Sequence, residues 1–254
     1  MTTTLIVLAH PDRRSFNRAW AAASERASKA LGHRVIWSDL HAMAFDPVET
    51  AAHYPGLDPA APFDVLKAQE AASASGRLPG DVAGEIDKIW RADRIVFHFP
   101  LWWFSPPAIL KGWCDRVLAH GALHSIDERF DRGLCQGKRA LFCVTTGSSA
   151  AESAYNGKEG DIRLLLWPLA YTLRYLGITV LEPRIVHGVH GYHEGREKAA
   201  LEARLAREVE AHADTIAAFD RLAAIPFNAD TDFDDEGRLK PTAQSHSHMI
   251  RHQP

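Results

Sequence analysis

Residues 97–113 read FHFPLWWFSPPAILKGW, and this stretch decides the fold. An apolar run, Arg94–Phe99, ends two residues before three consecutive aromatic residues, and two prolines then precede a stretch of helical period. Pro107 suits the first position of a helix over Pro107–Leu118, because the first N–H groups of a helix have no intrahelical acceptor and proline has no N–H. The segment therefore predicts a buried strand, a loop and a helix.

Other segments of the same two kinds alternate along the chain. Four further apolar runs predict strands, at Thr4–Ala9, Arg34–Ser38, Arg139–Thr145 and Thr179–Val186. Helical period is found at Asn17–Leu31, Phe63–Ala74, Asp81–Ala92, Asp161–Leu176 and Glu194–Phe219. Strands that are apolar throughout are typical of a sheet covered on both faces. The alternation predicts an α/β fold, a doubly wound five-stranded parallel sheet with helices on both faces. A ligand would then bind at the carboxyl ends of the strands.

The length of the chain predicts one large domain, over residues 1–225. The polar composition of residues 226–254 predicts an extended arm. The chain has 254 residues and a formal net charge of −3, so electrostatics favour neither nucleic acid nor an anionic membrane as a partner. The N-terminal apolar run is too short for a signal peptide, and no long apolar span follows. We therefore expect a cytoplasmic protein without membrane insertion.

The sequence gives little reason to expect a metal. Cys114, Cys135 and Cys143 form no CxxC pair and no metal-ligand spacing, which favours reduced thiols. The arm contains the alternate histidines His246 and His248, a pattern that suits metal capture. An exposed, solvated tail is the commoner meaning of such a segment. We therefore assign no metal ligands.

The loop after the first predicted strand reads AHPDRRSFNRAW, residues 9–20. His10 ends the strand, and Ser15 and Asn17 are residue types that cap a helix. The free N–H groups of a helix start, with an imidazole and two arginines nearby, can cradle a phosphate. For this loop alone, a capped helix with solvated arginines is the favoured alternative. Neither a GxGxxG fingerprint nor a GxxxxGK[ST] loop is present.

The loop after the third predicted strand carries Trp102, Trp103 and Phe104. Consecutive residues cannot share one face of an element, so at least one ring must point into a cleft or onto another surface. Filling of the core or of a protein interface is the alternative. Aromatic walls with backbone N–H groups suit a flat heterocycle with polar edges.

The loop after the fourth predicted strand reads TTGSSAAESAYNGKEGD, residues 145–161. Thr145, Thr146 and Gly147 form a small-residue turn whose N–H groups can donate to the edge of a ring, and Asp161 can cap the next helix. Such a turn alone is weak evidence. Together, the three loops predict a phosphate site, an aromatic wall and a set of donors at one sheet edge. They indicate a planar, nucleotide-like cofactor, for which flavin is the obvious candidate.

These segments resemble the flavodoxin-like NAD(P)H:quinone reductases, the family of DT-diaphorase. The similarity extends from about Leu5 to Pro183 and is carried by LIVLAHPDRRSFN, FPLWWFSPPAILKGWCDRV, TTGSS and GDIRLLLWPL. The resemblance implies a flavodoxin-like homodimer with its active site at the interface and with FAD, or FMN, as cofactor. It also implies a two-electron ping-pong reaction, in which hydride passes from NADPH or NADH to the flavin and then to a quinone. The chemistry is then the cofactor's, and the protein orients it and excludes water.

The resemblance also assigns site residues. The cofactor-binding residues it implies are His10, Ser15, Phe16, Asn17, Pro100, Leu101, Trp102, Trp103, Phe104, Thr145, Thr146, Gly147 and Ser148. Those of the first loop would hold the diphosphate end, residues 100–104 would flank the isoalloxazine ring, and residues 145–148 would donate to its pyrimidine side.

The resemblance is incomplete where the family handles the flavin proton. Its better-known members carry a tyrosine and a histidine before the GD pair, where this chain has Ser153 and Glu159. We expect Glu159 and the nearby Tyr155 to be the catalytic residues, although an ionised carboxylate would disfavour negative charge on the flavin. The lid that a partner chain would contribute falls around His124 and Ile126, so the preferred quinone stays open.

The changed positions leave two other functions open. One is a flavoprotein ancillary subunit of a glutathione-gated potassium-efflux system. The other is a one-electron carrier, for which the chain is long and lacks a strongly acidic docking face. The extra C-terminal part favours FAD over FMN, whereas the choice between NADH and NADPH stays open.

Overall fold

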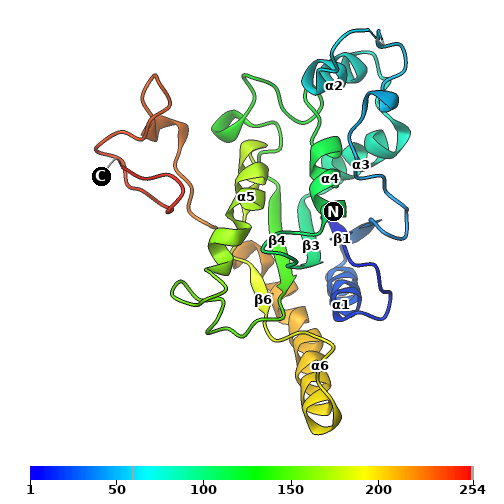
Figure 1. Cartoon of the computed structure of the whole chain (residues 1–254), viewed down its shortest axis with the longest axis vertical. Helices are drawn as coiled ribbons and strands as arrows, with labels where there is room; N and C mark the ends of the chain where they lie inside the picture. The colour runs from blue at the N-terminus through cyan, green and yellow to red at the C-terminus, as the bar shows by residue number, and fades with distance from the viewer. Residues whose placement is uncertain (59, 253–254) are drawn as a thin grey trace.

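The computed structural model describes residues 1–58 and 60–252 and has a parallel sheet at its centre (Figure 1). The strands are β1 (Thr3–Leu8), β2 (Arg34–Asp39), β3 (Arg94–Pro100), β4 (Arg139–Thr145), β5 (Thr179–Val180) and β6 (Arg184–Val186). Their order is β2-β1-β3-β4-β5, with β6 also paired to β4, and every pairing is parallel. The predicted doubly wound parallel sheet is confirmed.

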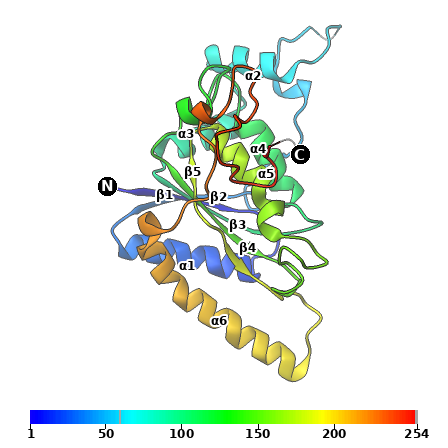
Figure 2. The same cartoon turned by 90° about the vertical axis from the view of Figure 1, so that its left-hand side faces the viewer.

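Helices cover both faces of this sheet. They are α1 (Phe16–Ala30), α2 (Val65–Ala74), α3 (Gly80–Arg91), α4 (Ala108–Val117), α5 (Ile162–Tyr175) and α6 (Gly195–Ala217). Short 3-10 turns lie at Ala51–His53, Phe130–Arg132, Phe219–Arg221 and Asp230–Asp232. Figure 2 shows α1 and α6 on one face and α3, α4 and α5 on the other. Among the described residues, none of the helices has the length and apolar character that crossing a membrane requires.

The predicted strand Thr179–Val186 is wrong as a single element, because the structure divides it into β5 and β6. β5 pairs with the start of β4 and β6 with its end. The break contains Pro183, which has no N–H to donate to a neighbouring strand and therefore interrupts the ladder. The local signal for the division was thus present in the sequence.

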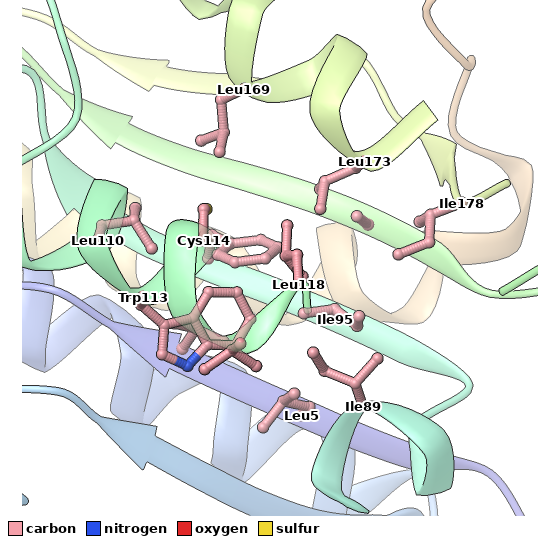
Figure 3. Packing of buried hydrophobic residues seen from close by; sticks show 14 of the residues in the cluster. Leu5, Ile89, Ile95, Leu110, Trp113, Cys114, Leu118, Leu169, Leu173 and Ile178 are labelled. Atoms are coloured by element: carbon pink, nitrogen blue, oxygen red, sulfur yellow. The ribbon is translucent and has the colours of Figure 1, made fainter. Parts of the chain in front are cut away.

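The larger core lies between the sheet and the helices α3, α4 and α5 (Figure 3). Phe97 of β3 meets Trp113 of α4 edge-on, with ring centroids 6.0 Å apart, and contacts Phe142 of β4 at 5.5 Å. All three side chains are fully buried. These contacts pack α4 against the two central strands, β3 and β4. They therefore position the end of β3 and the three aromatic residues that follow it, Trp102–Phe104, called the WWF segment below.

Gly112 of α4 lies where the helix touches the segment before α2. A Cβ atom there would be 2.1 Å from the Pro47 carbonyl oxygen and 2.6 Å from the Pro47 Cα. We expect Gly112→Ala to lower the free energy of unfolding by about 1–3 kcal/mol, the usual cost of overpacking. Gly84→Ala in α3, whose Cβ would meet open space, is the control and should stabilise by about 0.5–1 kcal/mol. Urea denaturation followed by circular dichroism measures both, and equal effects would contradict the close contact.

Residues 228–252 form an extended segment beside α5, shown in orange and red in Figure 1. It folds back on itself through an antiparallel bridge between Phe233 and Leu239. Asp131 accepts a hydrogen bond from the Asp230 N–H at 2.6 Å, which attaches the segment to the body of the protein. The division at residue 225 into a domain and an arm stays a prediction.

Candidate active site

The loop between β1 and α1 joins the fourth-strand loop through Asn17. Its buried side-chain amide donates to Thr145 Oγ1 at 2.8 Å, while its Oδ1 atom is buried without a hydrogen-bond partner. Ser15 caps α1 by accepting from the Arg18 N–H at 3.2 Å, and Phe16 packs on Trp20. The start of α1 is therefore held against the end of β4, with an unused acceptor at the junction.

His10 follows the end of β1, and a hydrogen bond to its ring defines the tautomer of the neutral imidazole. Its Nδ1 accepts the Asp12 N–H at 3.0 Å, so the neutral ring carries its proton on Nε2. Burial lowers the pKa of His10, outweighing the opposing effects of Asp12, so the neutral form is favoured. Its ring lies 6.0 Å from that of Trp102. The first loop therefore also touches the third-strand loop.

The WWF segment forms a tight two-residue turn. Trp102 and Ser105 exchange two backbone hydrogen bonds of 2.9 and 3.0 Å, and Trp103 and Phe104 occupy the central positions with φ of +49° and +61°. Such turns normally take glycine or asparagine, because a bulky side chain is strained at positive φ. The turn leaves the Trp103 side chain 93% exposed. The expectation that at least one of these rings points into a cleft or onto another surface is confirmed by Trp103.

Side-chain hydroxyl groups are linked to one another in the loop after β4, called the hydroxyl loop below. Thr146 Oγ1 lies 2.9 Å from Ser148 Oγ, which in turn lies 2.5 Å from Ser153 Oγ. The loop after β6 supports it, since the N–H groups of Gly188 and Val189 donate to the carbonyls of Ser148 and Thr146 at 2.9 Å each. The result is a fixed chain of three hydroxyls at the edge of the sheet.

A cleft of about 460 Å³ separates the WWF turn from this hydroxyl loop. Its lining residues are Leu101, Trp103, Phe104, Thr146, Gly147, Ser148, Glu152, Ser153, Glu159, Ile162 and Leu165. The first-loop residues His10, Phe16 and Asn17 lie outside this lining, next to it through the Asn17–Thr145 and His10–Trp102 contacts. The two proposed catalytic residues are separated: Glu159 lines the cleft, whereas Tyr155 is 86% exposed and outside the lining.

Four lining residues lie outside the predicted site: Glu152, Ser153, Ile162 and Leu165. Of these, the sequence argument singled out only Ser153, as a changed position. Ile162 and Leu165 begin α5 and, three positions apart, face the cleft together, a spacing that the predicted helix already contained. For Glu152, no spacing or motif in the sequence indicated a place in the cleft. Hydrogen bonds from Ser149 and the Lys158 ammonium hold the pKa of Glu152 below its usual range, so it adds negative charge to the wall.

A second, apolar groove of about 820 Å³ lies between α2, α4 and α5. Phe104 and Leu165 line both this groove and the cleft, so the two hollows meet. His124, of the segment assigned to a partner-chain lid, also lines the groove, while Ile126 is exposed.

Comparison with known proteins supports this geometry. The family model described as "Flavodoxin-like fold" matches residues 2–212. The NAD(P)H dehydrogenase [quinone] 1 of Rattus norvegicus is 40% identical over 187 residues, covering 73% of this chain and 68% of the relative. The ribosyldihydronicotinamide dehydrogenase [quinone] of Homo sapiens is 41% identical over 183 residues, covering 71% of this chain and 79% of the relative.

A solved structure extends the similarity over nearly the whole fold. It is a putative quinone reductase from Klebsiella pneumoniae, 31% identical, with a TM-score of 0.83 and 95% of each chain covered. This chain therefore belongs to the flavodoxin-like fold family, among its NAD(P)H:quinone reductases.

Proposed function

We propose that this chain is a flavin-dependent NAD(P)H:quinone oxidoreductase. The observation that carries the proposal is a cleft between the loops after β3 and β4, walled by the exposed Trp103. The loop after β1 lies next to this cleft through the Asn17–Thr145 hydrogen bond. Family membership at about 40% identity supports the same activity. When bound, the flavin supplies the two-electron chemistry, and the protein's part is to bind, orient and exclude water.

The residues present fit a flavin. The rings of Trp103 and Phe104 offer one apolar wall and the side chains of Ile162 and Leu165 another, as a flat tricyclic ring requires. The Gly147 N–H suits its polar edge, whereas the N–H groups of Thr146 and Ser148 already donate to the Val186 carbonyl and to Thr146 Oγ1. The N-terminus of α1 with His10 Nε2–H suits a phosphate. FAD is the form we propose, since the loop after β6 adds a surface next to this site. NADPH or NADH is the proposed reductant.

Proton handling is proposed for Glu159, with Tyr155 as the second candidate. Glu159 has the supporting position, because it lines the cleft together with the hydroxyls of Ser148 and Ser153. A linked pair of hydroxyls can hold a proton or pass it between oxygens. The exposure of Tyr155 means that it would reach the reacting atoms only if a partner or a ligand drew it inward.

A homodimer with the active site at its interface is also proposed. The apolar groove between α2, α4 and α5 supports it, because Phe104 and Leu165 connect that groove to the cleft. A second copy seated in the groove would therefore border the reacting ring. We expect sedimentation equilibrium to give twice the chain mass at micromolar concentration, and a monomer would contradict the proposal. A cytoplasmic location is proposed with it, supported by three buried thiols.

The central experiment is identification of the flavin, followed by steady-state assay. Purified protein should release FAD on denaturation, and NADPH or NADH should bleach the bound flavin, with rapid recovery on adding a quinone. Parallel lines in double-reciprocal plots would support the ping-pong order. A colourless protein that takes up neither FAD nor FMN would overturn the proposal.

The regulatory and one-electron alternatives have less support. The relatives reported above are named as dehydrogenases of reduced nicotinamides with a quinone acceptor or as a quinone reductase, and none of these three names refers to ion transport. Fast quinone turnover by the isolated chain would exclude a purely ancillary role, whereas slow turnover with every quinone would favour one.

A further inference from the structure

On the face of the sheet opposite the large core, three potential metal ligands meet. His98 of β3 and Cys143 of β4 are register partners on adjacent strands, and His212 reaches them from α6. One nitrogen of each imidazole and the Cys143 Sγ all lie within 4.8 Å of one another. All three residues are buried. This is the one such triad within the described part of the chain, and the quinone reductase site does not use it.

Ser24 of α1 holds the two imidazoles together. Its Oγ lies 2.9 Å from His98 Nε2 and 2.7 Å from His212 Nε2. One hydroxyl proton can be donated to only one ring, so the other ring must donate its own Nε2–H. His98 Nδ1 is left buried with no hydrogen-bond partner. A polar group that is fully buried and unpaired destabilises the fold and requires an explanation, of which a bound ion is one.

The ligand atoms of the triad favour a soft metal ion, and the charge around them favours a monovalent one. Two imidazoles and a thiol are soft or borderline ligands, and no carboxylate belongs to the triad. Cys143 is fully buried, and the triad has no carboxylate that could offset an added positive charge. Arg184, the register partner of Cys143 across β6, already adds a positive charge nearby. A divalent ion would add a further net charge, whereas a monovalent ion that replaces one proton adds none.

We propose that His98, Cys143 and His212 form a trigonal binding site for a soft monovalent cation, Cu(I). On binding, the S–H bond of Cys143 breaks and its proton goes to solvent, while one Cu–S and two Cu–N bonds form. No electron is transferred. The ligands come from positions 98, 143 and 212, which is why no local spacing in the sequence revealed them.

The C-terminal end of α6 covers this site, so an ion would enter beside it. The buried residues of α6 are His212, Thr215 and Ile216, all near its C-terminal end, and the rest of the helix projects beyond the sheet in Figure 2. The site can thus be loaded when this end of the helix separates from α1. A bound ion would then link α6 to the two central strands.

The test is anaerobic competition for Cu(I) against a chromogenic chelator, with the purified flavin-loaded protein. We expect one Cu(I) per chain and an X-ray absorption spectrum with one sulfur and two nitrogen ligands. Cys143→Ser should weaken binding at least about 100-fold, the upper limit of what changes outside the ligand shell cost. Cys135→Ser, at a buried cysteine outside the triad, should leave binding unchanged. His212→Gln, on the outer helix, gives a second test if Cys143→Ser fails to fold.

Several results would overturn the proposal. They are no Cu(I) uptake above the chelator background, loss of binding in Cys135→Ser, or unchanged binding in both folded ligand variants. Equal affinity for Zn(II) would refute the choice of a monovalent ion. Quinone reductase activity plays no part in these outcomes, so the site and the proposed function stand or fall separately.

Discussion

Replacing Glu85 by alanine is expected to lower the free energy of unfolding by about 3–5 kcal/mol, the range for breaking a buried charged pair. Glu85 of α3 is 1% exposed. One carboxylate oxygen accepts from Ser38 Oγ at 2.5 Å and from Trp113 Nε1 at 2.8 Å. The other pairs with the Lys88 ammonium. Alanine would leave donors from β2, α4 and α3 without their acceptor, in a place where Trp113 has no access to water.

Urea denaturation followed by circular dichroism measures this loss. Glu85→Gln keeps the shape but turns an amide N–H₂ toward other donors, so we expect an intermediate loss of about 1–3 kcal/mol. Asp87→Ala is the matched control on the same helix, because Asp87 pairs with Arg91 at the surface and should lose less than about 1 kcal/mol. If Glu85→Ala destabilised no more than Asp87→Ala, the network would not hold α3 and α4 to the sheet.

The features predicted correctly from sequence depend on local signals. The apolar run Arg94–Phe99 identified β3, and the prolines after it identified the start of α4, since both signals lie within a few residues of the element. The convergence of three loops on one edge followed from topology, because the carboxyl ends of parallel strands share that edge. The Asn17–Thr145 bond and the cleft confirm this convergence.

The features that were missed depend on contacts between distant residues, or on a conformation that the residue type does not indicate. Nothing local shows that Glu85 meets Trp113, or that His212 reaches His98, because tertiary packing alone brings them together. The left-handed backbone at Trp103 and Phe104 carried no signal, since glycine or asparagine normally marks such a turn. Backbone strain of this kind is typical of functional sites, which is consistent with its place at the cleft.

The second large effect is expected at Gly147, where a single added methyl group should hinder the flavin without disturbing the protein. A Cβ atom at Gly147 would have only the His190 Cβ within reach, at 4.0 Å, and its backbone does not require positive φ. The residue lines the cleft, so the methyl group would project toward the space assigned to the ring. Overpacking costs about 1–3 kcal/mol. Gly147→Ala should therefore weaken flavin binding by about 10- to 100-fold.

Two measurements distinguish this steric effect from general damage. The stability of the flavin-free protein, from urea denaturation, should change by less than about 0.5 kcal/mol, as for a surface substitution. Fluorescence titration with FAD should show the loss of affinity in Gly147→Ala, and none in Gly80→Ala, where the added Cβ meets open space outside the cleft. Unchanged FAD affinity in Gly147→Ala would mean that the flavin does not lie against this turn. The cleft between the WWF turn and the hydroxyl loop would then not be its binding site, because the backbone of residue 147 forms part of that wall.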